Sequence, residues 1–150
     1  MLKYVTAQVT FAEVPDEITL CINISNCPCH CEGCHSSYLA ENVGKSLDQD
    51  SLNALIHINH GITCVAFMGG DVNPKQVNDL AYHIKQTGLK TCWYSGRCEL
   101  SLDIDLRNFD YIKLGPYISS KGGLDHPNTN QRFYHIVNQQ MTDITSRFYK

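Results

Sequence analysis

Three closely spaced cysteines constrain this chain more than any other feature of its sequence. Cys27, Cys31 and Cys34 form a Cys-x3-Cys-x2-Cys motif, and no fourth cysteine follows at a matching spacing. Iron–sulfur clusters usually take four cysteine thiolates. The motif therefore favours a cubane cluster with one iron left open, and an open iron is a site for chemistry. Gly33, inside the motif, lets the backbone approach a ligand closely.

A zinc site is the alternative for the same segment, because His30 and His35 lie beside the cysteines. Structural zinc sites usually combine one Cys-x2-Cys pair with a distant second pair. The remaining cysteines are scattered, so the spacing favours a cluster over zinc. Cys29 makes a second, shorter spacing. We interpret it as a free thiol; an exchange with a neighbouring ligand and a disulfide are the alternatives.

Composition limits the class of protein. The 150 residues suit one domain, and the net charge of −3 without a basic run argues against nucleic acid as a partner. The first residues lack the apolar core of a signal peptide, and no stretch approaches the roughly 18 apolar residues of a membrane span. We therefore expect a single cytoplasmic domain over residues 1–150 with no membrane partner. Eight cysteines in such a compartment indicate metal or redox chemistry.

Apolar patterning predicts strands that alternate with helices. One helix follows Asp48, with Leu52, Leu55 and Ile56 on its apolar face. A second begins at Asn73 and Pro74, and Gly88 ends it. The predicted strands are an edge strand at residues 5–11 and buried strands at residues 18–24, 62–68, 89–94 and 111–114. Residues 99–109 read as a weak helix or turn, and no clear periodicity follows Tyr117.

This alternation predicts an α/β fold with a parallel sheet and right-handed crossovers. Ligands gather at the carboxyl ends of the strands in such folds. Three features follow predicted strands: the cysteine motif, the segment Met68-Gly69-Gly70-Asp71, and Ser95-Gly96. A complete eight-fold barrel takes about 250 residues, so we expect a partial barrel. Its open side would admit a bulky substrate such as a protein loop.

The double glycine is the second motif with a chemical interpretation. Gly69 and Gly70 let main-chain groups approach a ligand, and Asp71 offers a carboxylate that accepts from an ammonium group. A double glycine alone is a weak signal. It becomes specific about 35 residues after a three-cysteine loop in an alternating α/β chain.

With these motifs the chain resembles the radical S-adenosylmethionine superfamily. Within it, the chain is similar to the activating proteins of the anaerobic (class III) ribonucleoside-triphosphate reductases, over most of its length. The resembling segments are Asn26-Cys27-Pro28, Cys31-Glu32-Gly33-Cys34-His35, Phe67-Met68-Gly69-Gly70-Asp71, Trp93-Tyr94-Ser95-Gly96, Gly115-Pro116-Tyr117 and Asn130-Gln131-Arg132.

The resemblance implies a [4Fe–4S] cluster on Cys27, Cys31 and Cys34, with S-adenosylmethionine on the fourth iron. Reductive cleavage of S-adenosylmethionine would lead to hydrogen abstraction from a glycine of the reductase, which leaves a glycyl radical there. A low-potential donor such as flavodoxin or ferredoxin would supply the electron. The implied cofactor-binding residues are Gly33, Cys34, His35, Met68, Gly69, Gly70, Asp71, Ser95 and Gly96, with His35 placed to stack on adenine.

The chain departs from its relatives near the fourth buried strand. Many relatives carry aspartate-glycine-lysine there, whereas this chain has Leu114, Gly115 and Pro116. The resemblance then implies that a polar contact to the cofactor is missing at that point. Lys113 is a candidate replacement, although a lysine at a strand end is more often solvated.

Other residues keep a structural alternative. Asn130, Gln131 and Arg132 fit either cofactor or partner binding or, for the arginine, a surface ion pair. Trp93 fits core packing. Cys21, Cys64 and Cys92 fall in predicted strands and fit small buried hydrophobic residues, Cys98 fits a free thiol, and the dispersed histidines suggest no second metal.

Two alternatives to the reductase activase stay open. One is an activase of another glycyl-radical enzyme of the formate-lyase type. The other is a zinc-binding interaction module without enzymatic activity.

Overall fold

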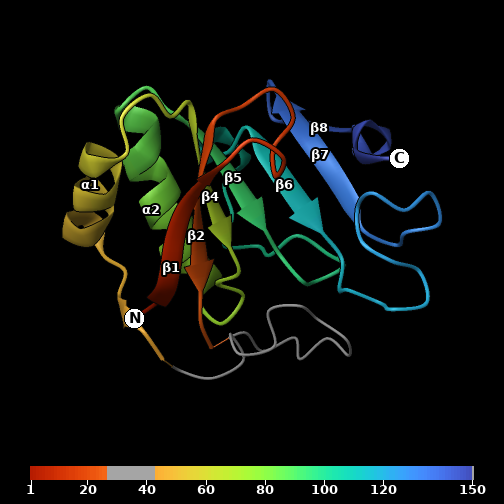
Figure 1. The fold of residues 1–150 in the computed structure, drawn as a ribbon, viewed down its shortest axis with the longest axis horizontal. Coiled ribbons are helices and arrows are strands. Elements are labelled where there is room, and N and C mark those ends of the chain that lie inside the picture. Colours follow the sequence, from red (N-terminus) through yellow and green to blue (C-terminus); the bar gives the residue numbers. More distant parts are fainter. Residues whose placement is uncertain (27–42, 150) are drawn as a thin grey trace.

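The computed structural model describes residues 1–26 and 43–149 of the chain. These residues form one mixed sheet of eight strands, in the order β3-β1-β2-β4-β5-β6-β7-β8 (Figure 1). The strands are β1 (Lys3–Thr10), β2 (Thr19–Ile24), β3 (Lys45–Ser46), β4 (Cys64–Met68), β5 (Lys90–Tyr94), β6 (Tyr111–Leu114), β7 (Arg132–Val137) and β8 (Gln140–Asp143). The helices are α1 (Gln49–Ile58), α2 (Pro74–Gln86) and the short 3-10 helices η2 (Leu106–Asn108) and η3 (Thr145–Phe148).

The centre of the sheet is parallel. Strands β2, β4, β5 and β6 run side by side in the same direction, and the predicted buried strands are confirmed. Antiparallel strands flank this centre on both sides: β1 and β3 at one end, β7 and β8 at the other. The sequence pattern did not predict this antiparallel pairing. Among the described residues the sheet is open, with β3 and β8 as its edges. A partial barrel of radical S-adenosylmethionine type stays a prediction.

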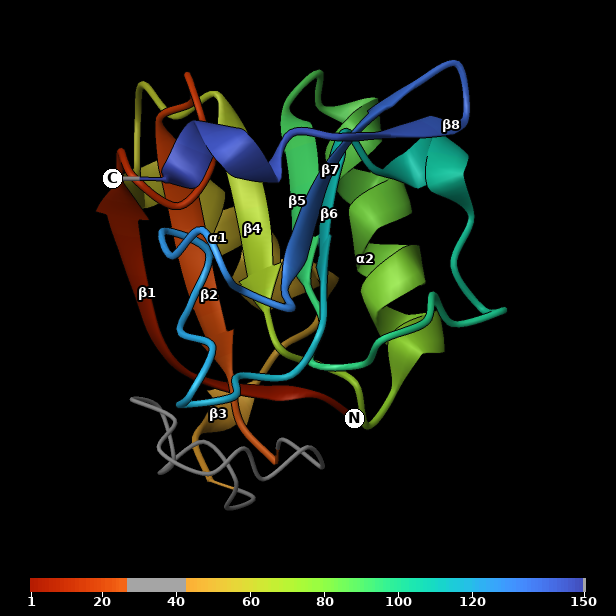
Figure 2. The same ribbon diagram turned by 90° about the vertical axis from the view of Figure 1, so that its right-hand side faces the viewer.

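Local sequence signals define both α-helices. Asp48 caps α1 by accepting from the Ser51 backbone N–H at 2.8 Å, and the Ser51 hydroxyl accepts from the Asp48 N–H at 2.9 Å. Asn73 caps α2, which has proline at its first position. The predicted apolar residues of α2 are buried (Val77, Leu80, Ala81 and Ile84). Both helices cover the same face of the sheet (Figures 1 and 2).

The sheet has two apolar faces. The helix-covered face carries the larger core, with Phe67 and Trp93 fully buried. The opposite face carries Cys21, Cys64 and Cys92 beneath aromatic side chains, which confirms the prediction that these cysteines are buried. Burial raises the pKa of Cys21 to about 11 and raises the pKa of the other two thiols as well. The three thiols therefore stay protonated at neutral pH, and a protonated thiol is a poor metal ligand.

The hairpin of β7 and β8 was not predicted. Asn138 and Gln139 form its two-residue turn, and both have positive φ values of 52° and 62°. Such turns usually use Asn-Gly or Asp-Gly, so the pair Asn-Gln gave little signal. The hairpin leads into η3, where the Phe148 ring packs 4.9 Å from the Phe133 ring centroid. The C-terminal segment thus lies on the sheet face opposite α1 (Figure 2).

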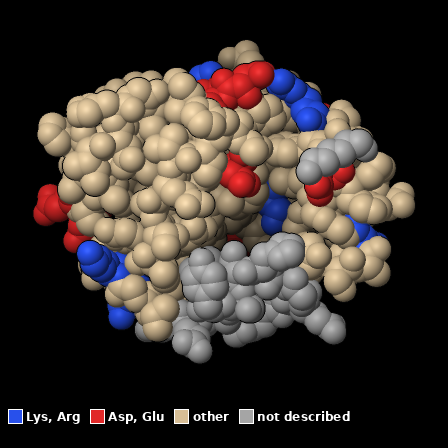
Figure 3. All heavy atoms as spheres, viewed as in Figure 1, with Lys and Arg blue, Asp and Glu red and all other residues tan. Residues whose placement is uncertain are grey.

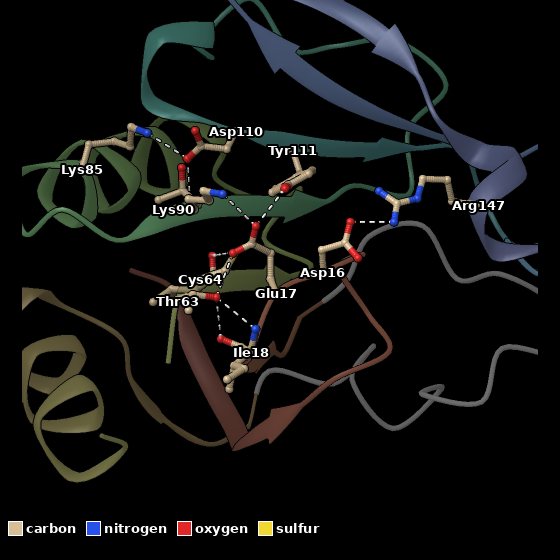
Figure 4. Close-up of polar contacts among 12 residues, drawn as sticks. Asp16, Glu17, Ile18, Thr63, Cys64, Lys85, Lys90, Asp110, Tyr111 and Arg147 are labelled. Carbon is tan, nitrogen blue, oxygen red and sulfur yellow. Dashed lines mark hydrogen bonds and ion pairs between the residues drawn. The ribbon is translucent and has the colours of Figure 1, made fainter. Parts of the chain in front are cut away.

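A buried carboxylate joins the amino ends of the parallel strands. Glu17 precedes β2 and accepts hydrogen bonds from Thr63 at 2.7 Å, Lys90 at 2.9 Å and Tyr111 at 3.0 Å (Figure 4). These three partners lie just before β4, at the start of β5 and at the start of β6. One side chain therefore connects four neighbouring strands at the edge of the sheet opposite the carboxyl end of β2.

The pKa of Glu17 reflects two opposing effects. Burial acts to raise it, but the hydrogen bonds from Lys90, Thr63 and Tyr111 outweigh burial and lower it below its ordinary value of 4.5. A lowered folded-state pKa means that the carboxylate stabilises the fold above the unfolded-state pKa. That contribution is lost as the pH falls from about 4.5 through the folded-state value.

We predict that Glu17→Gln lowers the free energy of unfolding by about 1–3 kcal/mol at neutral pH, because hydrogen bonds to the charged form are lost. Lys90 is half-exposed and stays hydrated, which limits the loss. Asp16→Asn is the control, since the Asp16–Arg147 ion pair is exposed and should contribute less than about 1 kcal/mol (Figure 4). Urea unfolding at several pH values measures both. A Glu17→Gln deficit that does not shrink below pH 4.5 would contradict the role of the ionised carboxylate.

Candidate functional site

The ends of the four parallel strands lie in one row. Asn23 pairs with Met68, Met68 with Tyr94, and Tyr94 with Lys113, one residue from each of β2, β4, β5 and β6. The chain segments that follow these residues therefore start at the same edge of the sheet, towards which the four arrows point in Figure 1. The three sequence motifs expected at strand ends leave the sheet at this edge.

The cluster motif follows β2. The predicted cluster and cofactor residues Cys27, Gly33, Cys31, Cys34 and His35 lie outside the described residues. Within residues 1–26 and 43–149, no group of three or more His, Cys, Asp or Glu side chains is arranged to hold a metal ion.

The described ends of that segment are joined. The Ser25 hydroxyl donates to the Val43 carbonyl, and the Ser25 N–H donates to the Lys3 carbonyl at 2.9 Å. Both ends of the cysteine segment therefore start from fixed positions beside β1 and β2. The donor set fits an iron–sulfur cluster, since thiolates are its usual ligands, and the strand before it, β2, ends at the edge where the other motifs lie.

The double glycine makes a tight turn after β4. Gly69 and Gly70 have φ values of 108° and 98°, in the region that favours glycine. The Gly69 N–H donates to the Tyr94 carbonyl at 3.0 Å, and its carbonyl accepts from the Trp93 indole at 2.7 Å. A Cβ on Gly69 would lie 3.2 Å from the Ile24 carbonyl oxygen. The turn thus lies against the end of β2, the strand that leads into the cysteine motif.

The structure brings Asp71, Ser95 and Gly96 together. One carboxylate oxygen of Asp71 accepts from the Ser95 hydroxyl at 2.5 Å, and the other accepts from the Gly96 N–H at 2.9 Å. Asp71 and Ser95 are 7% and 1% exposed. Two predicted parts of the site, 24 residues apart in sequence, therefore form one hydrogen-bonded unit.

Lys113 differs from the solvated lysine that its place at a strand end suggested. It is 8% exposed, and its ammonium donates to the carbonyls of Ser95 at 3.2 Å and Gly115 at 2.7 Å. The ammonium also lies 5.9 Å from the Tyr94 ring centroid. Leu114, where the resemblance led us to expect an aspartate, packs into the helix-side core. The sequence named Lys113 as a candidate for a polar contact but did not predict its burial, which follows from the pairing of Lys113 with Tyr94.

The sequence left two interpretations open for Asn130, Gln131 and Arg132: binding of the cofactor or a partner, or a surface ion pair of the arginine. Arg132 forms an ion pair with Asp143 at 3.6 Å, and both side chains are over 40% exposed, as the surface interpretation expects. Asn130 donates to the Pro116 carbonyl at 3.0 Å, whereas its side-chain oxygen is buried without a hydrogen-bond partner among the described residues. Asn130 thus keeps an acceptor at the same edge of the sheet.

Two pockets flank the end of β5, one on each side of the sheet. A pocket of about 560 Å³ on the helix side is lined by Asp71, Trp93, Arg97, Cys98 and Leu102 among others. A pocket of about 490 Å³ on the opposite side is lined by Glu13, Tyr94, Gln131, Arg147 and Phe148 among others. Consecutive residues of β5, Trp93 and Tyr94, thus face different pockets next to the predicted site.

The face of the molecule in Figure 3 carries basic and acidic side chains in separate small groups. No continuous basic surface is visible on that face, in keeping with the net charge of −3. None of the helices in the described parts of the chain is long and apolar enough to cross a membrane.

These features define an α/β protein in which a three-cysteine motif follows one of four parallel strands in sequence. A family model described as the 4Fe-4S single cluster domain matches residues 18–114. This range covers more than half of the 150 residues and includes Cys27, Cys31 and Cys34, so the chain belongs to that family of iron–sulfur proteins. The predicted iron–sulfur cofactor is confirmed at this level. No curated protein and no solved structure matched the chain in the same comparisons.

We predict that Gly70→Ala destabilises the protein more than Gly61→Ala. Both glycines have positive φ, which costs an alanine roughly 1–2 kcal/mol. At position 70 the new Cβ would also lie 2.6 Å from the Val77 side chain, whereas nothing lies within 4 Å at position 61. Overpacking of this kind adds about 1–3 kcal/mol. Equal losses for the two variants in urea unfolding would show that the turn is not packed against α2.

Proposed function

We propose that this chain is the activating enzyme of an anaerobic ribonucleoside-triphosphate reductase. The observation that carries the proposal is that the strand before the cysteine motif ends at the same sheet edge as the other two motifs. This strand, β2 of an iron–sulfur family domain, ends beside the Gly69–Gly70 turn, and the hydrogen-bonded unit of Asp71, Ser95 and Gly96 lies at the same edge.

The chain's own residues would divide the work. Cys27, Cys31 and Cys34 would hold the cluster as thiolates, and Gly33 and His35 would lie against S-adenosylmethionine. The turn after β4 would receive the methionine end of that molecule, because glycine there leaves main-chain groups open to close approach. When bound, a reduced [4Fe–4S] cluster supplies the electron for cleavage of S-adenosylmethionine and hydrogen abstraction from a glycine of the reductase.

The open sheet supports a protein substrate. Its parallel centre lies between antiparallel strands and is not closed among the described residues. We propose that these strands form a partial barrel whose open side admits the glycine-bearing loop of the reductase. A low-potential donor such as flavodoxin or ferredoxin would reduce the cluster, and water exclusion by the docked partner would protect the reaction.

The test is anaerobic reconstitution with iron and sulfide, then reduction with dithionite in the presence of S-adenosylmethionine. Formation of 5′-deoxyadenosine is expected, followed by a glycyl-radical signal in electron paramagnetic resonance once the reductase is added. Cleavage with a radical only on a formate-lyase-type partner would point to that activase class. A colourless protein that takes up zinc and leaves S-adenosylmethionine intact would support the interaction module and overturn the proposal.

We predict that Cys34→Ala abolishes 5′-deoxyadenosine formation, because the cluster loses one of its three protein ligands. Cys98→Ala is the matched control: Cys98 is an exposed free thiol, and its loss should leave the rate unchanged. Product analysis by chromatography and iron content measure both effects. A Cys34→Ala protein that forms product at the normal rate would remove Cys34 from the ligand set.

A further inference from the structure

Two buried charged side chains bind the same residue from opposite sides. Asp71, which follows β4, accepts from the Ser95 hydroxyl and the Gly96 N–H. Lys113, near the end of β6, donates to the Ser95 carbonyl and the Gly115 carbonyl. Asp71 and Lys113 are 7% and 8% exposed. We call Asp71, Ser95, Gly96 and Lys113 the Ser95 clamp.

Backbone hydrogen bonds extend the clamp across three strand ends. The Ser95 N–H donates to the Lys113 carbonyl at 2.9 Å, and the Gly115 N–H donates to the Arg97 carbonyl at 2.7 Å. The Ser95 hydroxyl also accepts from the Arg97 N–H at 3.1 Å. The loops after β5 and β6 are therefore joined to each other, and Asp71 joins the loop after β5 to the loop after β4.

Charge makes these bonds strong. A hydrogen bond with an ionised partner is shorter and roughly twice as strong as a neutral one. A buried charge is also costly unless polar partners satisfy it. Each oxygen of the Asp71 carboxylate already accepts from the loop after β5, and Lys113 is bonded to two loop carbonyls. The hydrogen bonds of the clamp are therefore strong enough to fix the spacing of the loops after β4, β5 and β6.

We propose that Asp71 and Lys113 are positioning residues, which act on S-adenosylmethionine through the Ser95–Gly96 loop. This inference rests on the proposed function and gives Asp71 a different role from the direct contact that the double-glycine motif suggested. The clamp pre-orders the loop, so that binding does not have to order it.

A double-mutant cycle tests whether Asp71 acts on the binding of S-adenosylmethionine through Ser95. Asp71→Ala and Ser95→Ala should each weaken the binding of S-adenosylmethionine to the reconstituted protein about tenfold, the size expected for lost charged hydrogen bonds. If Asp71 acts through Ser95, the double variant should bind about as weakly as either single variant, because residues in one network are not additive. Asp71→Asn keeps an acceptor oxygen and should restore part of the affinity. Anaerobic equilibrium dialysis measures the wild-type protein and the four variants.

A second measurement does not depend on activity. Asp71→Ala removes the acceptor of the Gly96 N–H, so that amide should exchange with solvent at least about tenfold faster, as should the neighbouring Arg97 amide. Lys113→Met should speed exchange at Ser95, whose N–H bonds the Lys113 carbonyl, if the ammonium helps to hold this loop. Asp79→Asn and Lys75→Met change exposed charges on α2 and serve as controls, with unchanged exchange and affinity.

The outcomes separate the clamp from the proposed function. Additive losses, near a hundredfold in the double variant, would mean that Asp71 contacts the ligand itself and would overturn the clamp alone. Unchanged exchange at Gly96 in Asp71→Ala would overturn it as well. A wild-type protein that holds its cluster but does not bind S-adenosylmethionine would overturn the proposed function, and the positioning role with it.

Discussion

The register of four parallel strands is the constraint on which the candidate site depends. Hydrogen bonding aligns Asn23, Met68, Tyr94 and Lys113 in one row, each the last or next-to-last residue of β2, β4, β5 or β6, so the segments after these strands must start at one edge. A shift of one residue in any strand would also turn its side chains to the other face. The end of β2, which leads into the cysteine motif, lies near the double glycine and the Ser95–Gly96 loop because this register holds.

Buried charged side chains stabilise the parallel strands at both their amino ends and their carboxyl ends. The two networks have different consequences. At the amino edge Glu17 joins the four strands through side chains, and the network lies away from the candidate site. At the carboxyl edge Asp71 and Lys113 bind mainly loop groups around Ser95. Apolar layers separate the two edges, and the buried thiols of one layer stay protonated. These charged hydrogen bonds hold the strand ends in position, where apolar packing alone would let them move.

Elements with strong local signals were predictable, and elements that depend on distant contacts were not. The α2 helix begins at an asparagine cap with proline at its first position and presents apolar residues at helical spacing, all properties of neighbouring residues. The β7–β8 hairpin turns at Asn138 and Gln139, which carry a weak turn signal, so its strands were missed. The sequence left Lys113 open between solvent and a polar contact because its charge is local information, whereas its burial depends on carbonyls of the loops after β5 and β6.

The sequence by itself determined the iron–sulfur class, because the spacing of Cys27, Cys31 and Cys34 is a local property that a family model also recognises. It also determined the order of strands and helices in the parallel centre. Only the tertiary structure decided that the Asp71 carboxylate bonds the Ser95–Gly96 loop, since these partners lie 24 residues apart and meet through the pairing of β4 with β5. Spacing along the chain specifies ligand sets and helix caps; hydrogen bonds between strands specify which loops become neighbours.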